Sequence, residues 1–263
     1  MPTLERPGFA LNYRLEGAEG APVVMLSNSL ASALGMWSAQ VPALLAAGFR
    51  VLRYDTRGHG QSGAPPAPWS IADLAADALA LLDALGIARV HFCGLSLGGM
   101  TGQWLGTHHG DRLYSLTLCA TTAFAGPPAV WQDRIAMVEA GGMSAVCEAT
   151  INRWFTAAGQ QTAAAAIAPI RAQILATPVA GYTGCGGAIA VMDQRESITA
   201  IRTPTLVMVG ADDPSTPVAA SEFLQQQIPG AQLVVVPDSM HLFNVERPAE
   251  FNHALLAFLS SHG

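Results

Sequence analysis

Lysine is absent from this sequence of 263 residues, whose thirteen basic residues are all arginine. This absence excludes mechanisms that need a lysine amine, such as Schiff-base and pyridoxal chemistry, and it excludes the lysine-dependent P-loop. Charged residues are also scarce, since they make up 12% of the chain against the roughly 25% that is typical of soluble domains. The net charge is −6 and no basic cluster is present, which excludes nucleic-acid binding.

Long apolar runs and paired cysteines are missing as well. No stretch reaches 18 apolar residues without a charged or turn-forming residue, and residues 1–8 contain no apolar signal core. We therefore expect no membrane association and a cytoplasmic location. No C-x-x-C pair and no His or carboxylate cluster has the spacing of metal ligands, so we expect neither a metal nor another cofactor. The four cysteines are expected to be small buried side chains: Cys93, Cys119, Cys147 and Cys185.

Short apolar runs that end in polar or glycine residues dominate the rest of the chain, of which 51% is hydrophobic. Such nearly continuous apolar runs are typical of strands in a parallel sheet that is covered on both faces. The alternating run 9–15 is predicted to be an edge strand. The other predicted strands are residues 22–27, 51–54, 90–93, 113–118, 205–209 and 232–236.

Helical patterns separate these strands. Ser70 can cap a helix with Asp73 reaching back to it, and an apolar stripe follows up to Leu85. Gly86 then stands where a C-terminal glycine is favoured. The repetition of strand, helix and strand implies right-handed crossovers, and therefore an α/β fold with a mostly parallel, doubly wound sheet.

The alternation stops after Thr122 and resumes near Thr205. Between these positions, helical patterns occur near 131–139, 143–155 and 162–176, with no convincing strand. We therefore expect an insertion that covers the carboxyl edge of the sheet. The predicted core is residues 1–122 and 204–263, and residues 123–203 are the predicted helical cap.

The segment Gly94-Leu95-Ser96-Leu97-Gly98 follows a predicted strand and precedes a helical stretch. This is the context of a G-x-S-x-G nucleophile elbow, in which a serine occupies a strained turn between a strand and a helix. The alternative is a turn that is merely rich in small residues. The context favours Ser96 as a catalytic nucleophile.

A nucleophilic serine needs a base, and in folds of this type the base is a histidine near the end of the chain. His262 is next to the C-terminus, and His253 lies within the last predicted helix. His241 follows the strand at 232–236, in a loop at the carboxyl edge of the sheet, where ligands bind in such folds. His241 is therefore the predicted base, and His59, in a glycine-rich turn, is predicted to make structural hydrogen bonds.

The acid that orients the base is expected in the loop after the strand at 205–209. Asp212 and Asp213 both stand there, and the residues alone do not rank them. The oxyanion of an acyl transfer also needs two backbone N–H donors. Leu97, next after the nucleophile, supplies one, and we choose Leu30, in the loop after the first parallel strand, for the other.

These features, together with the run Asp55-Thr56-Arg57-Gly58-His59-Gly60-Gln61-Ser62, resemble the α/β-hydrolase superfamily along the whole chain. The resemblance implies the α/β-hydrolase fold and a Ser-His-Asp catalytic triad. In this superfamily the acid is usually the third residue after the loop glycine, and a proline follows four residues later. With Gly210 and Pro217 in those places, the resemblance implies Asp213.

Several segments are similar, more narrowly, to the 3-oxoadipate enol-lactonases of the β-ketoadipate pathway of aromatic catabolism. These segments are residues 26–30, 36–37, 51–55, 99–106, 131–135, 153–156 and 181–185. Two positions depart from that family's usual pattern. Gly186 stands where a second cysteine is usual, and Ala190 stands where an arginine is usual.

The predicted cap contributes the candidate substrate-binding residues Trp131, Arg134 and Trp154. Arg134 could bind a substrate carboxylate, because a guanidinium matches a carboxylate with two parallel hydrogen bonds. The alternative for Arg134 is an ion pair with Asp133 or Glu139 on a solvated face.

The resulting hypothesis is a cofactor-free serine hydrolase that opens a small lactone, with 3-oxoadipate enol-lactone as the substrate that the resemblance implies. Its expected partner is a small-molecule ester or lactone, and the sequence makes no prediction about oligomeric state. A broad-specificity carboxylesterase or a cofactor-free perhydrolase would use the same triad with a different pocket. A non-catalytic, hydrolase-like binding protein is the alternative of another class, against which an intact triad argues.

Overall fold

The chain folds around one eight-stranded sheet in the computed structural model, which describes residues 2–262. The spatial order of the strands is β1-β2-β4-β3-β5-β6-β7-β8. The pairs β1–β2 and β2–β4 are antiparallel, whereas all later neighbours are parallel. The strands are β1 (Thr3–Arg6), β2 (Phe9–Glu16), β3 (Val23–Ser27), β4 (Arg50–Tyr54), β5 (Val90–Leu95), β6 (Leu113–Cys119), β7 (Thr205–Gly210) and β8 (Gln232–Val236).

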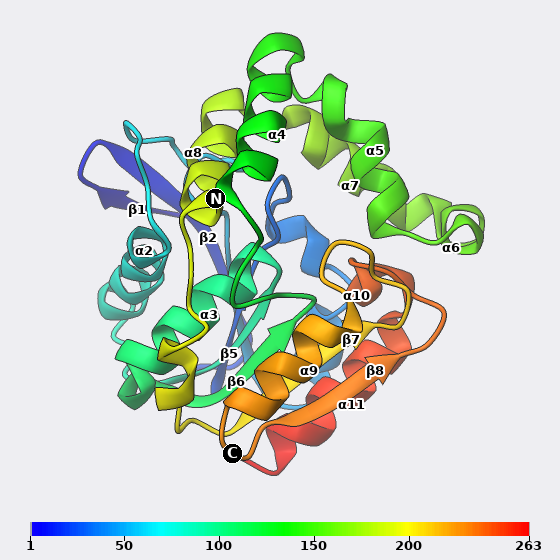
Figure 1. The fold of residues 1–263 in the computed structure, drawn as a ribbon. Helices are drawn as coiled ribbons and strands as arrows, with labels where there is room; N and C mark the ends of the chain where they lie inside the picture. The colour runs from blue at the N-terminus through cyan, green and yellow to red at the C-terminus, as the bar shows by residue number, and fades with distance from the viewer. Residues whose placement is uncertain (1, 263) are drawn as a thin grey trace.

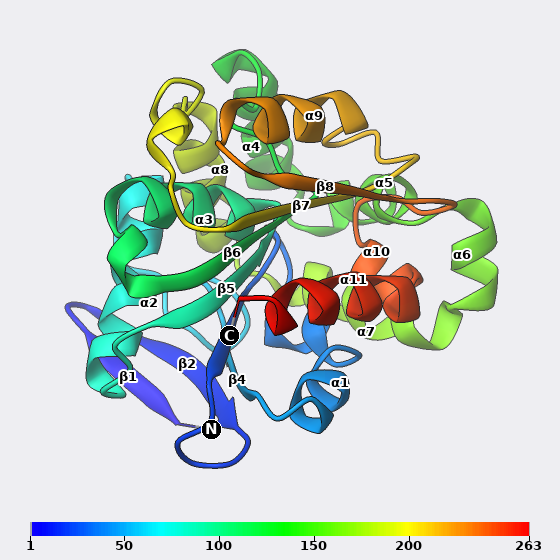
Figure 2. The same cartoon turned by 90° about the horizontal axis from the view of Figure 1, so that it is seen from below.

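Helices cover both faces of the sheet (Figure 2). Leu44 of α1 and Leu255 of α11 belong to one buried cluster, and Leu81 of α2 and Leu224 of α9 belong to another. Two covered faces explain the nearly continuous apolar runs, because both sides of each inner strand are shielded from water. These helices are α1 (Val41–Ala46), α2 (Ile71–Ala84), α3 (Leu97–His108), α9 (Val218–Gln227), α10 (Phe243–Glu246) and α11 (Pro248–Ser260).

All six predicted parallel strands are present, with bounds that differ by at most two residues. The prediction of residues 9–15 as an edge strand is wrong, because β1 pairs with β2 and takes the edge. β1 has only four residues, none of them fully buried. A strand this short and this polar leaves no hydrophobic pattern by which the sequence could reveal it.

The predicted helix after Ser70 is confirmed as α2. The Asp73 N–H donates to Ser70 Oγ at 3.2 Å, and the Ser70 N–H donates to Asp73 Oδ2 at 2.8 Å. This reciprocal capping box satisfies two backbone donors at the start of the helix. Gly86 follows the helix with φ of +66°, a left-handed conformation that glycine adopts without steric strain.

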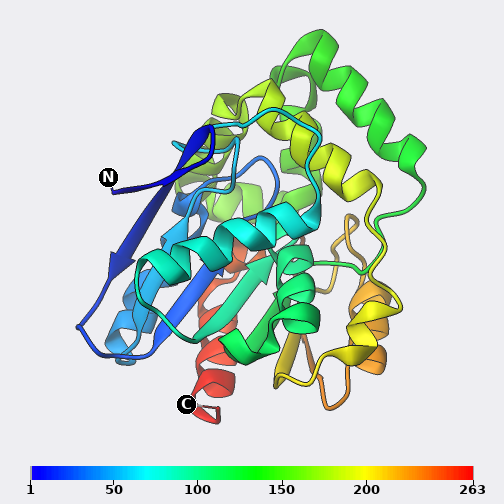
Figure 3. The same ribbon diagram turned by 90° about the vertical axis from the view of Figure 1, so that its left-hand side faces the viewer.

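A block of five α-helices stands between β6 and β7, which are neighbours in the sheet. Figures 1 and 3 show this helical block lying over one end of the sheet. The predicted helices near 131–139, 143–155 and 162–176 correspond to α4, α5 and α7. The block consists of α4 (Pro128–Gly141), α5 (Ser144–Trp154), α6 (Ala157–Thr162), α7 (Ala164–Ala176) and α8 (Val179–Ala190).

Helix α8 was not expected from the sequence, because glycine disfavours a helix by about 1 kcal/mol relative to alanine and α8 contains several. Close packing against the core explains two of them. A Cβ on Gly181 would lie 1.8 Å from the Gly58 carbonyl oxygen, and a Cβ on Gly184 would lie 2.6 Å from the Trp69 ring. Glycine therefore allows the α8 backbone to contact the core directly.

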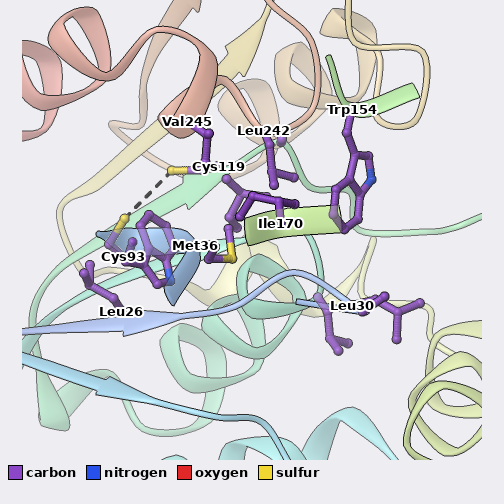
Figure 4. Packing of buried hydrophobic residues seen from close by; sticks show 14 of the residues in the cluster. Leu26, Leu30, Met36, Cys93, Cys119, Trp154, Ile170, Leu242 and Val245 are labelled. Carbon is purple, nitrogen blue, oxygen red and sulfur yellow. Dashed lines mark hydrogen bonds between the residues drawn. The ribbon is translucent and has the colours of Figure 1, made fainter. Parts of the chain in front are cut away.

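The helical block and the sheet share one hydrophobic cluster. Figure 4 shows Trp154 and Ile170 of the block among Leu30, Met36 and Leu242, which come from the segments that follow β3 and β8. Burial of about 25 cal/mol per Å² of apolar surface therefore stabilises the block and these segments together. Displacement of the helical block is therefore expected to disturb these segments, and displacement of the segments is expected to disturb the block.

The four cysteines are free and buried, as expected. Cys93 and Cys119 on neighbouring strands bring their Sγ atoms within 3.9 Å (Figure 4). Within residues 2–262, no helix by itself has the length and hydropathy to cross a bilayer, and only α7 and α8 taken together, bent by 92°, meet that test.

Candidate active site

Ser96 occupies the sharp turn between β5 and α3. Its φ and ψ are 57° and −111°, in a region that costs a residue with a side chain about 1–3 kcal/mol. The Ser96 N–H donates to the Cys119 carbonyl at 2.9 Å, and Thr121 Oγ1 donates to the Ser96 carbonyl at 2.8 Å. These bonds to the end of β6 hold the strained turn, and Ser96 lines a cavity.

The glycines on either side of Ser96 are required by close backbone contacts. A Cβ on Gly94 would lie 2.1 Å from the Gly98 carbonyl oxygen, and a Cβ on Gly98 would lie 2.2 Å from the Ser27 carbonyl oxygen. No side chain fits at either position unless the turn moves. The G-x-S-x-G spacing is thus a packing requirement of the turn that presents Ser96.

His241 and Asp213 come together from the loops after β8 and β7. His241 Nδ1 and Asp213 Oδ2 are 2.8 Å apart, and both side chains are almost completely buried. Asp212 is exposed, and its backbone N–H donates to the Ser239 carbonyl at 3.0 Å. The structure therefore brings Asp213, rather than Asp212, to the histidine.

The surroundings of Asp213 favour its ionised form. Burial alone would raise its pKa, but the attraction of His241 and hydrogen bonds hold the pKa below its usual value. The Ser215 N–H donates to Oδ1 at 2.7 Å, and Thr216 Oγ1 donates to Oδ2 at 2.7 Å. An ionised Asp213 favours the imidazole tautomer with its proton on Nδ1, which leaves Nε2 able to accept a proton.

Two backbone N–H groups near Ser96 have no hydrogen-bond acceptor within the described part of the chain. They belong to Leu30 and Leu97, the two predicted oxyanion donors. The loop that carries Leu30 is fixed on both sides. The Gly98 N–H donates to the Asn28 carbonyl at 3.0 Å, and the Ala31 N–H donates to His59 Nε2 at 3.0 Å.

His59 thus makes the structural hydrogen bonds that were predicted for it. Its Nδ1 lies 3.1 Å from the Arg57 carbonyl oxygen, to which it donates when Nε2 accepts from Ala31. Burial lowers the pKa of His59, although the Arg57 carbonyl and Asp55 act in the opposite direction. A neutral His59 keeps Nε2 as an acceptor, so the loop next to Leu30 stays in place.

A cavity of about 400 Å³ lies between these loops and the helical block, within the range of small-molecule sites. Ser96 and His241 line it, and the Trp154 ring stacks on His241 with ring centroids 6.1 Å apart. Every predicted site residue other than the backbone donor Leu97 and the buried Asp213 is in its wall. The wall residues predicted from the sequence are Leu30, Ser96, Trp131, Arg134, Trp154 and His241.

Two arginines give the cavity a positive wall. Arg134 of α4 and Arg153 of α5 both line it, and no Asp or Glu of the described residues 2–262 does so. The Arg134 guanidinium lies 5.0 Å from the Trp131 ring centre, and Arg153 Nη2 donates to Thr150 Oγ1 at 3.2 Å. Among residues 2–262, neither arginine forms an ion pair, so the ion pair of Arg134 with Asp133 or Glu139 is not observed.

The positive charges of these two arginines affect the pKa values of neighbouring groups. Burial raises the pKa of Tyr182, while Arg134 and Arg153 act to lower it. Burial, followed by the nearby charge of Arg134, lowers the pKa of Arg153 itself. Two cations that repel each other across a cavity are stabilised by an anion placed between them.

Arg153 and Thr216 are site residues that the sequence did not reveal. Helical periodicity shows which face of one helix is apolar, but it does not place a side chain of α5 opposite one of α4. The bond from Thr216 to Asp213 depends on a loop conformation that has no sequence pattern of its own. In the described chain, no three His, Cys, Asp or Glu side chains gather as a potential metal site.

Comparison with known proteins assigns the chain to one family. Residues 22–248 match the family described as the alpha/beta hydrolase fold. The chain is 37% identical over 257 residues to 3-oxoadipate enol-lactonase 2 of Acinetobacter baylyi, a match that covers 98% of this chain and 96% of that protein.

Solved structures agree with this comparison. The enol-lactonase from Burkholderia xenovorans LB400 has a TM-score of 0.95 and 41% identity, and the match covers 98% of this chain and all of that one. A thermophilic esterase from Thermogutta terrifontis has a TM-score of 0.91 and 30% identity, covering 99% and 97% of the two chains. The predicted fold and the predicted resemblance are both confirmed.

Proposed function

This chain belongs to the α/β-hydrolase family, and we propose that it is a serine hydrolase that opens 3-oxoadipate enol-lactone. The observation that carries the proposal is a cavity wall that holds Ser96 and His241 beside Arg134 and Arg153, which form no ion pair among residues 2–262. The similarity to enol-lactonases supports hydrolysis of a lactone. In the proposal, residues 123–203 act as a cap over a core of residues 1–122 and 204–263.

Ser96, His241 and Asp213 form the proposed triad. The Ser96 hydroxyl attacks the lactone carbonyl carbon while His241 Nε2 removes its proton, and Asp213 stabilises the resulting imidazolium. The oxyanion that develops accepts hydrogen bonds from the Leu30 and Leu97 N–H groups. One such donor is worth about 2.7–4 kcal/mol in the transition state.

Collapse of this intermediate breaks the ring C–O bond and leaves the acyl group on Ser96. The leaving oxygen is an enolate, which takes the proton from His241, and the enol then becomes a ketone. Water next attacks the acyl-enzyme, with His241 again accepting the proton, and the Ser96 hydroxyl is regenerated. No cofactor takes part in this sequence: the original Ser96 proton ends on the product, and a proton from the attacking water passes through His241 to Ser96 as the acyl–oxygen bond to Ser96 breaks.

The positive wall supports an anionic substrate. Adipate has two carboxyl groups and the lactone ring uses one, so 3-oxoadipate enol-lactone keeps a free carboxylate. Arg134 and Arg153 bind that carboxylate in the proposal, and Trp131 and Trp154 contact the apolar part of the substrate. The arginine that is usual near Ala190 in enol-lactonases is not required, because α4 and α5 already supply two cations.

A broad-specificity carboxylesterase is the second candidate. It is favoured by the similarity to the Thermogutta esterase, and the apolar residues that share the wall, such as Met100 and Ile189, would accept a neutral acyl chain. This candidate uses the same triad. The two candidates therefore differ in whether the substrate must carry a negative charge.

The proposed chemistry is tested by comparing wild type with Ser96→Ala in the hydrolysis of 3-oxoadipate enol-lactone. We expect the variant to lose at least about 10³-fold in kcat, as is seen when a nucleophile of this type is removed. Its thermal unfolding midpoint is expected to stay within a few degrees of the wild type, because the substitution removes one hydroxyl at a cavity wall and keeps the backbone hydrogen bonds of the turn. Retention of activity by the alanine variant would contradict the proposal.

A further inference from the structure

Glu246 is a buried carboxylate that the proposed mechanism does not use. It ends α10, five residues after His241, and is 9% exposed. Within residues 2–262 it forms no ion pair. A buried carboxylate without a cation is unfavourable unless hydrogen bonds compensate it, so the contacts of its two oxygens explain its presence.

The two oxygens of Glu246 bind two different parts of the chain. Oε1 accepts hydrogen bonds from the Thr156 N–H at 2.9 Å and from the Thr156 hydroxyl. Oε2 accepts a hydrogen bond from the Met240 N–H at 3.0 Å. Thr156 lies between α5 and α6 in the helical block, and Met240 directly precedes His241. The carboxylate therefore bridges the block and the loop of the proposed base.

A second link joins the same two segments on the other side of the base. The Leu242 N–H donates to the Trp154 carbonyl at 3.1 Å. Both neighbours of His241, residues 240 and 242, are thus held to the segment 154–156 of the block. The Trp154 ring, which stacks on the His241 ring, comes from the same short segment.

The space around the carboxylate leaves little freedom. A Cβ on Gly159 would lie 1.9 Å from Glu246 Oε1, so the first turn of α6 packs directly on the carboxylate. The Gly159 N–H donates to Thr156 Oγ1 at 2.9 Å, so this hydroxyl accepts from α6 while it donates to Glu246. The bridge is therefore a closed network with fixed geometry.

We infer that Glu246 is a positioning residue that sets the orientation of His241 by fastening its loop to the helical block. The inference rests on the proposed function, since it concerns the base of that mechanism. The block covers the cavity, so the bridge couples its placement to the alignment of the base. Loss of the bridge lowers the rate of proton removal from Ser96.

Glu246→Gln is the most informative substitution because it preserves the shape of the side chain. An amide has one acceptor oxygen, so in either orientation it presents an NH₂ group to one of the two backbone N–H donors. One arm of the bridge is therefore lost. Glu250→Gln is the matched control, since Glu250 is an exposed carboxylate on the first turn of α11.

The readout is the rate constant for inactivation by a fluorophosphonate, together with thermal unfolding of each variant. This reagent reacts with an activated serine and needs no lactone, so a wrong substrate assignment leaves the experiment intact. We expect Glu246→Gln to slow inactivation by roughly 10-fold to 100-fold, the range caused by misplacement of a catalytic group by about 1 Å. Glu250→Gln is expected to react at the wild-type rate.

A second pair of variants keeps the test decisive if Glu246→Gln does not fold. Thr156→Ser retains the hydroxyl that binds Glu246 and is expected to react at nearly the wild-type rate. Thr156→Val removes this hydroxyl and is expected to react more slowly. Wild-type inactivation rates for folded Glu246→Gln, or for folded Thr156→Val, would show that the bridge serves stability alone and would overturn the inference. In contrast, failure of wild type to open the enol-lactone, with the fluorophosphonate result as expected, would overturn only the proposed substrate.

Discussion

The Trp154 indole lies over the His241 imidazole, with ring centroids 6.1 Å apart and planes inclined by 30°. The face of an indole attracts a cation by about 0.5–2 kcal/mol, and in the proposed mechanism His241 carries a positive charge after it takes the proton of Ser96. In that mechanism the stacking is expected to stabilise the transition state more than the free enzyme. It also places a residue of the helical block directly on the proposed base.

This relationship predicts a graded effect at position 154. Trp154→Leu is expected to lower kcat by roughly 3-fold to 30-fold, since it removes the aromatic face, and Trp154→Phe is expected to lower it less. The measurement is steady-state kinetics on a small neutral ester, for which Arg134 and Arg153 matter little. Equal rates for the leucine and phenylalanine variants would contradict a role for the aromatic face.

The arginines are predicted to discriminate between anionic and neutral substrates. Arg134→Met and Arg153→Met are each expected to lower kcat/KM for the enol-lactone by roughly 10-fold to 150-fold, because a charge-assisted hydrogen bond contributes about 1.5–3 kcal/mol. Hydrolysis of p-nitrophenyl acetate is expected to change little. Arg202→Met is the control, since Arg202 does not line the cavity. A parallel loss on both substrates would indicate a structural role for the arginines.

His91 is predicted to make the fold sensitive to acid. It is buried, it bonds to Ser115 Oγ at 2.8 Å, and burial, followed by the charges of His262 and Arg89, lowers its pKa to about 4. An unfolded chain has a histidine pKa of about 6.5, so between these values the unfolded state binds the proton more readily. The contribution of neutral His91 to the free energy of unfolding is therefore fully present above about pH 6.5, and it is lost as the pH decreases towards 4.

Protonation of His91 is expected to lower the free energy of unfolding by roughly 1–3 kcal/mol. Urea unfolding at pH 7.5 and at pH 4.5 would measure this difference. His91→Gln is expected to show a smaller difference between the two pH values than wild type. His108→Gln, at an exposed histidine at the end of α3, is expected to show the wild-type difference. An unchanged difference in His91→Gln would refute the assignment.

Alanine substitutions at two glycines are predicted to have opposite effects on the free energy of unfolding. Gly98→Ala places a Cβ 2.2 Å from the Ser27 carbonyl oxygen, and we expect more than about 4 kcal/mol of destabilisation, the range of severe core disruption. Gly187→Ala lies within α8, where the added Cβ meets no atom within 4 Å apart from the adjacent residues and the backbone of its own helix, and we expect it to stabilise the protein by about 0.5–1 kcal/mol. Chemical denaturation of both variants checks this pair, and a tolerated Gly98→Ala would contradict the packing of the elbow.

The elbow and the base could be predicted because each depends on a local pattern. Ser96 lies between glycines after an apolar strand, and His241 follows the last strand, so the fold class places both at the carboxyl edge. The choice between Asp212 and Asp213 could not be made from a local pattern. Both carboxylates occupy the same loop, and only the loop conformation decides which one reaches the histidine, so the residues alone left the choice open.

The remaining features depend on contacts between distant segments. Helix α8 has a glycine-rich sequence that disfavours helix formation, and it forms because Gly181 and Gly184 allow close packing on the core. Arg153 joins Arg134 at the cavity only because α4 and α5 pack side by side. The Glu246 bridge joins residues 90 positions apart, and a single sequence carries no local signal of such a pairing.

The most direct test of the account is the ratio of kcat/KM for 3-oxoadipate enol-lactone to that for p-nitrophenyl acetate, measured with wild-type protein under the same conditions. The account predicts a ratio of at least about 100, because one charge-assisted contact with the free carboxylate contributes about 1.5–3 kcal/mol and the cavity offers two arginines. A ratio near one, with Ser96 still required for both reactions, would contradict the proposed substrate and favour a broad-specificity esterase.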